Sequence, residues 1–388
     1  MVKSLPPVPH PVNLNLESTL GCNLECVMCG SHLSGVTKMR RSMDAELLAR
    51  VEEQVIPGIE ELSLTVAGEP FLTPRLPQFV ALAERHGAEL SLNTNATLIK
   101  DTELLRRIMR HASVLRFSVD GATAETYEAI RVQGHFDTVM ENIALAVSIR
   151  DGLPAAERPR LVMCMVLMRD NVHELTAMVQ LADRLGLDRL DVAHVTVLVP
   201  ELDHQSTRHI PEVVDDAIRA AQAEAGRLAF RVNLPPLMSG ARTGPSSRAR
   251  LRLGLRELRQ VSSRRLRRLG KTFTRKAVMA RWSAEAGGKV PCRFLQDGVF
   301  ITIQGEVAPC PMPGRPIAGN LWEAPFSDIW NGEVLTRLRR GFIDGEPAEC
   351  CAHCSQNPHN YQPADPSTAA PPNYDIAGLS DRVVPQSK

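Results

Sequence analysis

Long hydrophobic runs, aromatic side chains and an N-terminal targeting segment are scarce or missing in this sequence of 388 residues. No stretch approaches the roughly eighteen consecutive apolar residues of a membrane-spanning helix, so no such helix is expected. The first residues, MVKSLPPVPHPVN, contain no apolar run that could serve as a signal peptide. We therefore expect a cytoplasmic protein. Aromatic residues make up only 4% of the chain, which predicts a mainly aliphatic core.

An excess of one charge is also missing. Lys and Arg number 45 against 44 Asp and Glu, and the formal net charge is +1. The chain as a whole therefore gives no reason to expect a polyanionic partner. Apolar residues at 44% and charged residues at 23% are typical of a globular protein. The length suits one large domain with a smaller one, or two or three ordinary domains.

One segment departs from this balance. Residues 248–276 are crowded with arginine and contain a single acid, Glu257. Leucines recur there at helical spacing, which predicts one or two basic amphipathic helices. We favour a solvated linker helix that lies on the rest of the protein. The alternative is a surface helix that binds an anionic partner, such as anionic lipid, a nucleic acid or an acidic protein.

Nine cysteines need an explanation in a chain that is expected to stay in a reducing compartment. Clustered thiols in such a compartment more often bind metal or carry out chemistry than form disulfides. Eight of the nine fall into two groups, which are Cys22, Cys26 and Cys29 near the start and Cys292, Cys310, Cys350, Cys351 and Cys354 near the end. Cys164 stands alone between Met163 and Met165, and we expect it to be a buried core thiol.

Strand-like and helix-like patterns alternate along the first two thirds of the chain. Six short apolar runs, rich in leucine or β-branched residues, predict strands. They are VNLNLES from Val12, ELSLTV from Glu61, LSLNTN from Leu90, VLRFSV from Val114, RLVMCMVL from Arg160 and RLDVAHVT from Arg189. Helical patterns such as DAELLARVEEQV lie between them. This alternation predicts an α/β fold of parallel β-α-β units, arranged as a partial (β/α)6 TIM-like barrel.

In barrels of this kind the reactive groups lie at the carboxyl ends of the strands, and all face one mouth. Groups with reactive or polar side chains follow each predicted strand. They are the first cysteine group, AGEP at 67–70, NTNAT at 93–97, SVDG at 118–121, Arg169 and His194. We expect these groups to lie close together.

Several residues near this mouth are candidates for a catalytic general base. His194 ends the sixth predicted strand, and Glu201, Asp203, His204 and His209 belong to the loop that follows it. The alternatives stay open for each of them. His194 is explained equally well as a core histidine with a hydrogen-bond partner, whereas for each of the other residues we favour a place in a solvated loop.

The first cysteine group has the spacing C-x3-C-x2-C. Structural zinc sites need four protein ligands, and three would leave one position open. A [4Fe–4S] cluster has four irons, normally with one thiolate each, so three cysteines would hold the cluster and leave one iron free to bind something else. A partial zinc knuckle and unreactive core thiols are the alternatives.

With this loop placed after the first strand of a partial barrel, the sequence resembles the radical S-adenosylmethionine (radical SAM) superfamily. The resemblance implies that the free iron chelates the amino and carboxylate groups of S-adenosylmethionine (SAM). It also implies reductive cleavage of SAM and release of a 5′-deoxyadenosyl radical. Met28 stands before the third cysteine, where many members have an aromatic residue. Methionine is an apolar substitute that can still pack on the cofactor.

Other strand ends match the family position by position. Gly68-Glu69-Pro70 resembles the motif after the second strand that engages the amino group of SAM, and the stretch ending in Asn95 resembles the third-strand motif. Ser118 and Arg131 correspond to residues of the fourth-strand region that contact the carboxylate of SAM. The resemblance therefore implies a cofactor site made of these six residues.

Four cysteines of the second group could together supply all the ligands of one site. They are Cys292, Cys310, Cys351 and Cys354. A zinc ribbon is a fair rival on ligand count alone. The stretch GEVAPCPMPGRPIAGNLWEAPFSDIWNGEV, followed by ECCAHC, resembles the SPASM/twitch extension of radical SAM enzymes, which implies one auxiliary [4Fe–4S] cluster. Cys350 is a rival of Cys351, but Cys351 forms the better C-x2-C pair with Cys354.

These patterns predict four parts. Residues 1–235 form the barrel, 236–290 the basic helical linker, 291–357 a small β-hairpin/helix domain with the auxiliary cluster, and 358–388 a disordered tail. The tail is assigned from its Pro, Ala and Ser content. Within 291–357, GVFITIQGEVAPC predicts a hairpin that turns at Gln304-Gly305.

The resemblance implies an oxidoreductase that abstracts a hydrogen atom from its substrate and passes the second electron to the auxiliary cluster. We favour dehydrogenation of an alcohol or sugar-like small molecule, because few residues precede Cys22 and leave no room for a leader-peptide recognition domain. A maturase of ribosomal peptides is the first alternative. A non-catalytic metal or iron–sulfur scaffold that binds nucleic acid is an alternative of another class. The expected partners are a small-molecule or peptide substrate and a reductant such as flavodoxin or ferredoxin.

Overall fold

The computed structural model describes residues 7–64, 66–197, 199–239, 292–312, 314–352 and 354. The predicted basic helix at 248–276 and the predicted tail at 358–388 lie outside these residues, and both stay predictions. The same holds for the proposed domain boundaries.

One mixed sheet organises the described chain. Its strand order is β10-β9-β8-β1-β2-β3-β4-β5-β6-β7, and β1 to β7 run parallel to one another, as does β8 to β1. The strands are β1 Asn13–Leu16, β2 Glu61–Ser63, β3 Glu89–Thr94, β4 Ala112–Ser118, β5 Arg160–Leu167, β6 Arg189–His194, β7 Val232–Asn233, β8 Gly298–Ile301, β9 Glu306–Ala308 and β10 Gly319–Asn320. All six predicted barrel strands are confirmed, and the two-residue β7 extends the parallel sheet beyond them.

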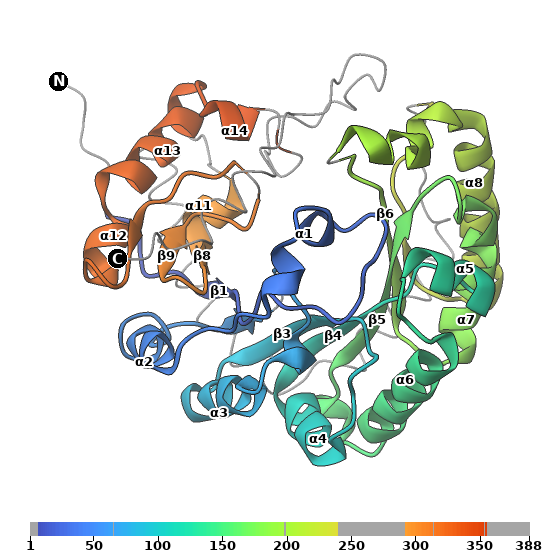
Figure 1. Ribbon diagram of the computed structural model, residues 1–388, viewed down its shortest axis with the longest axis horizontal. Coiled ribbons are helices and arrows are strands. Elements are labelled where there is room, and N and C mark those ends of the chain that lie inside the picture. The colour runs from blue at the N-terminus through green and yellow to red at the C-terminus, as the bar shows by residue number, and fades with distance from the viewer. Residues whose placement is uncertain are drawn as a thin grey trace.

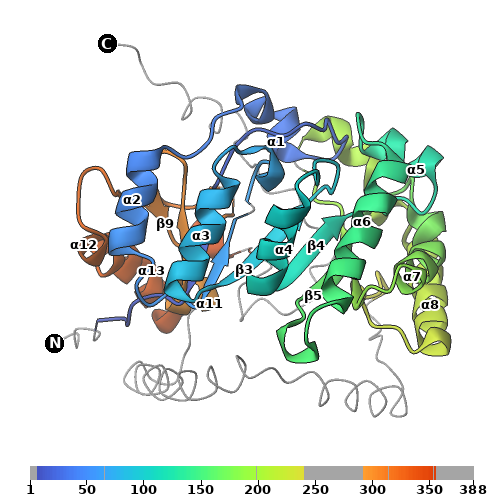
Figure 2. The ribbon, with the colours of Figure 1, turned by 90° about the horizontal axis from the view of Figure 1, so that it is seen from below.

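Helices cover the outer face of the parallel strands, from α2 at one side of the sheet to α8 at the other, and α5 lies toward the same end of the barrel as α1 (Gly30–Leu33) (Figures 1 and 2). They are α2 Ala45–Gln54, α3 Leu76–His86, α4 Thr102–His111, α5 Ala124–Ile130, α6 Phe136–Asp151, α7 Leu175–Arg184 and α8 Pro211–Leu228. Asp44 and Asp101 cap α2 and α4 by accepting hydrogen bonds from backbone N–H groups of the first turn. The result is the predicted partial barrel of α/β type.

Side chains on each strand alternate between the two faces, as extended backbone requires. Leu115 and Phe117 of β4 are fully buried against the helices, whereas Arg116 and Ser118 between and after them are only partly buried. The same alternation runs along β1 and the first four residues of β6. The barrel therefore has an apolar outer face that forms the core and a polar, solvent-accessible inner face.

The C-terminal region adds its strands to the same sheet. β8 pairs in parallel with β1, from Asn13 opposite Gly298 to Leu16 opposite Ile301. β8 and β9 form the predicted hairpin, and Gly305 in its turn has φ +85°, a conformation that favours glycine. The expected small auxiliary domain is thus continuous with the barrel sheet, because the free edge of β1 pairs with β8.

Short helices complete the C-terminal region and hold the start of the chain. They are α11 Arg293–Asp297, α12 Phe326–Trp330, α13 Glu333–Asp344 and α14 Glu349–Ala352. The Trp330 indole N–H donates to the Pro9 carbonyl at 2.9 Å, and the Val8 N–H donates to the Asn331 side chain at 2.9 Å. These contacts bring residues more than 300 positions apart into one packed layer.

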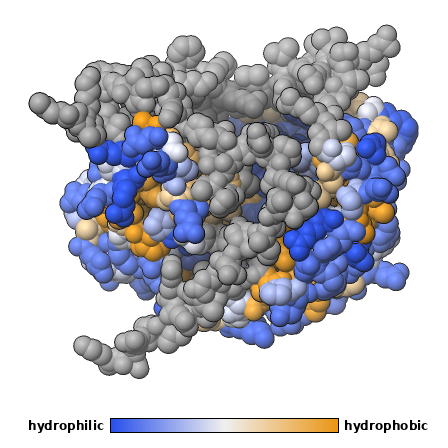
Figure 3. Space-filling view, turned by 90° about the horizontal axis from the view of Figure 1, so that it is seen from above, coloured by the Kyte–Doolittle hydropathy of each residue, from blue (hydrophilic) through white to orange (hydrophobic). Residues whose placement is uncertain are grey.

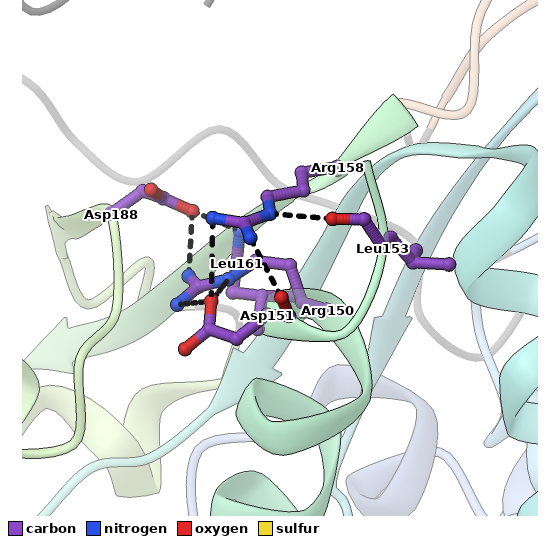
Figure 4. A network of polar contacts seen from close by, with 6 residues as sticks. All are labelled: Arg150, Asp151, Leu153, Arg158, Leu161 and Asp188. Carbon is purple, nitrogen blue, oxygen red and sulfur yellow. Dashed lines mark hydrogen bonds and ion pairs between the residues drawn. The ribbon is translucent and has the colours of Figure 1, made fainter. Parts of the chain in front are cut away.

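An ionic network closes the opposite end of the barrel, where β5 and β6 begin (Figure 4). Asp188 accepts from the Leu161 N–H at 2.7 Å and from Arg150 at 3.2 Å, and Arg150 also pairs with Asp151 at 2.8 Å. Arg158 donates to the Leu153 carbonyl at 3.0 Å. Groups at the amino ends of barrel strands stabilise the fold rather than take part in chemistry.

The face shown in Figure 3 is mainly hydrophilic in its described part, with hydrophobic residues scattered over it. Among the described residues, no helix has the length and hydrophobicity needed to span a membrane. The described outer helices thus place their apolar sides on the sheet.

Arg339 joins three of the C-terminal helices from a fully buried position. Its Nε donates to the Leu295 carbonyl at 2.9 Å and its Nη1 to the Trp330 carbonyl at 2.9 Å, while its guanidinium lies 4.4 Å from the centre of the Trp330 ring. Burial lowers the pKa of Arg339 to about 10, so it stays charged at neutral pH.

We expect Arg339→Ala to lower the free energy of unfolding by about 3 kcal/mol, because two buried carbonyls lose charged donors and a cavity opens. Urea denaturation followed by circular dichroism measures this loss. Arg337→Ala is the matched control on the same helix, since Arg337 is 73% exposed, and it should change stability by less than about 0.5 kcal/mol. Equal effects of the two variants would contradict the role of Arg339.

Candidate functional site

The loop that carries the first three cysteines begins directly after β1 and is held by the β2 side of the barrel. The Gly68 N–H donates to the Thr19 carbonyl at 3.2 Å, and the Glu69 N–H donates to the Gly21 carbonyl at 2.8 Å. A Cβ at Gly68 would lie 2.4 Å from the Gly21 oxygen and 2.6 Å from the Thr19 oxygen. Glycine is therefore required at position 68 for this close backbone approach.

Cys26 is buried, Cys22 and Cys29 are partly exposed, and hydrogen-bond donors lie beside Cys22 and Cys26. The Leu24 N–H lies 3.5 Å from the Cys22 Sγ, the Asn95 amide nitrogen 3.8 Å from the same atom, and the Arg131 Nη1 3.7 Å from the Cys26 Sγ. Burial raises the pKa of the Cys22 thiol and raises that of Cys26 to about 12. Such donors stabilise thiolates when a metal cluster takes the protons' place.

Glu69 is buried at the end of the β2 loop and its carboxylate is used for structure. Oε1 accepts from the Phe71 N–H at 3.1 Å and from the Thr94 hydroxyl at 2.7 Å, and Oε2 accepts from the Asn95 N–H at 2.7 Å. Burial raises the pKa of Glu69. Because a carboxylate has about four acceptor positions, roughly one remains for a further donor.

Asn95 connects the end of β3 to the cysteine loop. Its Nδ2 donates to the Asn23 side chain at 3.0 Å, and its Oδ1 accepts from the Thr97 hydroxyl at 2.7 Å. The predicted β2, β3 and cysteine-loop residues thus form one hydrogen-bonded assembly.

Arg131 reaches the site from the end of α5 and is held by the end of β4. Its Nε pairs with Asp120 at 2.7 Å, and Asp120 in turn accepts from the Val166 N–H at 2.7 Å. Asp120 is fully buried, so this ion pair is largely shielded from water. Ser118 lies two residues before Asp120, at the mouth end of the inner face. Arg131 thus lies beside Cys26, and Ser118 lies at the end of the strand that leads to Asp120.

A cavity of about 630 Å³ opens beside the cysteine loop, between α5 and the loop after β6. Val27, Ile130 and Leu202 line its apolar side, within a small hydrophobic cluster that also contacts Met28. Glu125 lies on its polar side. The cavity joins an apolar wall to the charged mouth of the barrel.

His194 lies on the other side of the sheet from the barrel interior. It is in register with the buried Leu167, and its Nδ1 lies 3.0 Å from the Thr207 hydroxyl. Burial lowers the pKa of His194, which favours the neutral ring. The side-chain alternation of β6 directs His194 outward, away from the barrel interior. Of the two roles considered from the sequence, this position fits a histidine of the core with a hydrogen-bond partner.

The other candidate bases separate into two pairs. Glu201 and His204 line the cavity, and the His204 Nδ1 donates to the Glu201 carbonyl at 2.7 Å. Asp203 instead pairs with Arg208 at 2.5 Å and with His209 at 3.0 Å. The structure therefore brings Glu201 and His204 to the mouth and engages Asp203 and His209 with each other.

The C-terminal cysteines line one small apolar pocket. Its walls include Phe294, Pro309 and Phe342. The pKa of Cys310 is raised to about 11, mainly by burial and also by the neighbouring thiols of Cys354 and Cys292. All four predicted members of the group line this pocket, Cys292, Cys310, Cys351 and Cys354, and Cys350 lines it as well.

Cys350 and Cys351 differ in their surroundings. Their Sγ atoms lie 3.8 Å apart, but Cys351 packs against the core and Cys350 is exposed. The pKa of Cys351 is raised by Cys350 and by burial, with smaller effects of Cys310 and Cys354, whereas neither Cys310 nor Cys354 is among the groups that shift the pKa of Cys350. This geometry favours Cys351 as the member of the four-cysteine group.

Cys164 is not the core thiol that the sequence predicted. Met163 and Met165 are buried against the helices, so the alternation of β5 turns Cys164 to the partly exposed inner face. Burial and the neighbouring Asp191 raise its pKa to about 12, which keeps the thiol neutral. The prediction was wrong because an apolar run on a strand does not show which residues face the barrel interior.

Two buried polar residues at the mouth were missed by the sequence reasoning. Asn171 is fully buried and donates to the carbonyls of Asp120 and Val166, each at 2.9 Å. Glu174 accepts from the Ala122 N–H at 2.6 Å. Both fix the loop that presents Asp120 and Arg131. Asn171 lies 51 residues from Asp120 and Glu174 lies 52 residues from Ala122, so these two contacts left no local signal in the sequence.

Among the described residues, no group of three His, Cys, Asp or Glu side chains lies close enough together to hold a single metal ion. A [4Fe–4S] cluster places each thiolate on a separate iron, so its ligands need not meet at one point. Three thiols with N–H and guanidinium donors beside them fit such a cluster, as do four thiols around an apolar pocket.

Comparison with known families decides between these chemistries. Residues 16–182 match the radical SAM superfamily, and residues 292–355 match the SPASM iron–sulfur cluster-binding domain. The chain belongs to the radical SAM superfamily. The zinc alternatives for both cysteine groups are thereby replaced. The cofactors are a SAM-binding [4Fe–4S] cluster, SAM itself and auxiliary iron–sulfur in the SPASM domain.

Relatives in sequence are radical SAM proteins with different substrates. The mycofactocin maturase MftC of Mycobacterium ulcerans is 29% identical over 180 residues, which are 45% of each chain. The PqqA peptide cyclase of Streptomyces rochei is 30% identical, over 49% of this chain and 50% of the relative. An AdoMet-dependent heme synthase of Methanosarcina barkeri is 29% identical over 83% of both chains. The matches thus span about half the length of the first two relatives.

Solved structures share the fold. SuiB of Streptococcus suis bound to SAM has a TM-score of 0.56 at 13% identity, over 86% of this chain and 68% of SuiB. The protein anSMEcpe with bound AdoMet has a TM-score of 0.58 at 14% identity, over 96% of this chain and 95% of that chain. At these identities the likeness concerns the fold alone.

We expect Gly68→Ala to displace the cysteine loop, because the added methyl group would overlap the Gly21 and Thr19 carbonyls. After anaerobic reconstitution, the variant should hold about four fewer irons per chain than the wild type, which is one cluster. Gly226→Ala is the control, since a Cβ at this helical glycine meets nothing within 4 Å. Full iron content in Gly68→Ala would contradict the close fit.

Glu17 predicts a pH dependence of stability. It lies at the end of β1 and accepts from the Ile303 N–H at 3.1 Å, and burial raises its pKa from 4.5 to about 7. The folded chain therefore retains this proton at pH values where the unfolded chain loses it. Its contribution is complete below the unfolded pKa and decreases as pH rises through about 7.

We accordingly compare the free energy of unfolding of Glu17→Gln with that of the wild type at pH 4.5 and at pH 8. The difference between the two chains should shift in favour of the variant by about 3 kcal/mol between these pH values, because a pKa change of one unit corresponds to about 1.36 kcal/mol. Urea denaturation at both pH values measures the difference. Parallel pH profiles of the two chains would show that Glu17 titrates at its ordinary pKa.

Proposed function

We propose that this protein is a peptide-modifying radical SAM enzyme that oxidises a residue of its substrate and uses the auxiliary cluster as electron acceptor. The observation that carries the proposal is the pair of cysteine sites on one sheet, one with three thiols and one with four. Three thiols leave an iron open for SAM, whereas four close the second site and suit it to electron transfer.

In this proposal Cys22, Cys26 and Cys29 hold the SAM-binding cluster, and Cys292, Cys310, Cys351 and Cys354 hold the auxiliary cluster. Reduction of SAM at the open iron supplies a 5′-deoxyadenosyl radical, which takes a hydrogen atom from the substrate. Loss of one further electron and one proton from the substrate completes a two-electron oxidation. An electron donor such as flavodoxin or ferredoxin starts the cycle.

The protein's own residues position SAM. Arg131, held by Asp120, would bind the carboxylate of SAM together with Ser118, and Glu69 would use its remaining acceptor position for the amino group. Asn95 orients the loop around them. The apolar cluster around Val27 and Ile130 offers a surface for the flat adenine ring.

The relatives favour a peptide substrate over the small alcohol that the sequence favoured. The name of PqqA peptide cyclase indicates a peptide substrate, and a structure of SuiB has been solved with the precursor peptide SuiA bound. The non-catalytic scaffold is set aside by membership of the superfamily. Glu201 and His204, at the cavity beside the cysteine loop, are the proposed general-base candidates.

A small-molecule substrate is the second candidate, and one observation favours it. The heme synthase matches 83% of this chain and 83% of its own length, against about half for the maturases. Incubating the reconstituted protein with SAM, dithionite and either candidate precursor peptides or porphyrins tests the choice. Substrate-stimulated 5′-deoxyadenosine and a product two mass units lighter identify the class, and stimulation by porphyrins alone would overturn the peptide proposal.

Removing cysteines separates the two clusters. We expect about eight irons per chain in the wild type, from two four-iron clusters. Cys26→Ala should abolish SAM cleavage, because the open cluster loses a ligand. Cys351→Ala should hold about four irons and still cleave SAM without product formation. Iron analysis and chromatography of 5′-deoxyadenosine measure both.

Cys350→Ala is the matched control, since Cys350 is exposed next to Cys351. It should retain about eight irons and full turnover. Loss of iron in Cys350→Ala but not in Cys351→Ala would reverse the assignment. Equal loss of SAM cleavage in Cys26→Ala and Cys351→Ala would contradict the division of roles between the clusters.

A further inference from the structure

Arg116 lies on the inner face of the barrel, midway along β4. Its neighbours Leu115 and Phe117 are fully buried against the helices, whereas Arg116 is partly exposed. It is in register with Asn93 on β3 and Val162 on β5. The alternation of the strand therefore directs its side chain into the space that the strands enclose.

The guanidinium of Arg116 has one partner in the described part of the protein. Its Nη1 donates to the Ser91 hydroxyl at 2.9 Å, and no carboxylate there lies within ion-pair distance of it. Two other arginines of the barrel are different, because Arg189 pairs with Asp191 at 2.5 Å and Arg131 with Asp120 at 2.7 Å.

An arginine in this state is poorly compensated. A guanidinium has five N–H donors, and a partly buried charge is costly without a counter-charge. On the neighbouring strand β5, Cys164 is the side chain that could become an anion, and it is in register with Ser118 of β4. Its raised pKa keeps the thiol neutral. Because Ser91 occupies Nη1, the edge formed by Nε and Nη2 is available for a planar anion.

The location of Arg116 relates it to the reaction. Ser118, on the same face, is two residues closer to the mouth, which is about 7 Å along the strand. The proposed SAM-binding residues surround that end of β4. A group held by Arg116 would therefore lie one layer below the cofactor, where a substrate must be placed for hydrogen abstraction.

We propose that Arg116 binds a carboxylate of the substrate inside the barrel, through a two-point contact of its Nε–Nη2 edge. This inference rests on the proposed function, since it assumes that a substrate enters the barrel. The fork of an arginine matches a carboxylate in shape as well as charge. The carboxylate can belong to an Asp or Glu side chain of a peptide or to a small carboxylic acid.

Equilibrium dialysis of the reconstituted full-length protein with SAM tests this. Three probes are used: a pool of capped random octapeptides with one fixed Glu and otherwise uncharged residues, the matched pool with Gln in its place, and glutarate. The chains are wild type, Arg116→Gln, Arg116→Lys and the control Arg106→Gln. Arg106 lies on the outer helix α4 and is 51% exposed.

We expect the wild type to bind the Glu pool at least about tenfold more tightly than the Gln pool, as a charge-assisted pair requires. Arg116→Gln should remove this preference, Arg116→Lys should retain part of it, and Arg106→Gln should retain all of it. Glutarate binding that exceeds that of the Glu pool and is lost in Arg116→Gln would also support the carboxylate site, and would assign it to a small molecule.

Two results would overturn the proposal. The first is that the wild type binds all three probes equally or binds none of them. The second is that Arg116→Gln retains the preference for the Glu pool. Iron content and 5′-deoxyadenosine release are measured on the same samples. They test the proposed function separately, because Arg116→Gln should retain about eight irons and the unstimulated cleavage of SAM.

Discussion

The pairing of β1 with β8 is the contact on which the arrangement of the molecule depends. Four residues of β1 pair with four residues of β8 in parallel, across nearly the whole length of the chain. The first cysteine loop leaves the end of β1, while Cys292 precedes β8 and Cys310 follows β9. A shift of this register by one residue would turn every β8 side chain to the other face and move one cysteine group relative to the other.

The close backbone contact at Gly68 completes this frame on the other side of β1. There the β2 loop binds the Thr19 and Gly21 carbonyls directly, and Glu69 binds the end of β3 through Thr94 and Asn95. The cysteine loop is thus connected to the ends of β2 and β3 by hydrogen bonds that do not involve a cluster. Such preorganisation reduces the ordering that cofactor binding would otherwise require.

Local patterns predicted what local sequence determines. Apolar runs marked all six barrel strands, and Gly305 marked the hairpin turn, because strand and turn propensities act over a few residues. The cysteine spacing marked both metal groups for the same reason. The structure further supports Cys351 over Cys350, through packing that spacing alone could not show.

The sequence did not predict in the same way which face of the sheet a side chain lies on, or which distant segments pair. Cys164 faces the inner side of the barrel because of the alternation of β5, and His194 faces outward because of the alternation of β6. Likewise, the union of β8 with β1 joins segments about 285 residues apart, and no local pattern encodes such a pairing. Asn171 and Glu174 were missed because their partners become neighbours only when the barrel closes.

The polarity of the inner face argues for the use of the barrel interior. TIM-type barrels fill their interior with branched apolar side chains, which contribute to stability. Here β3 and β4 present Asn93, Arg116 and Ser118 inward, and β6 presents the Arg189–Asp191 pair. Polar groups that are partly removed from water cost free energy unless they gain partners. In the proposed reaction, a substrate with charged or amide groups of its own would add partners to this polar face, whereas a wholly apolar substrate would not.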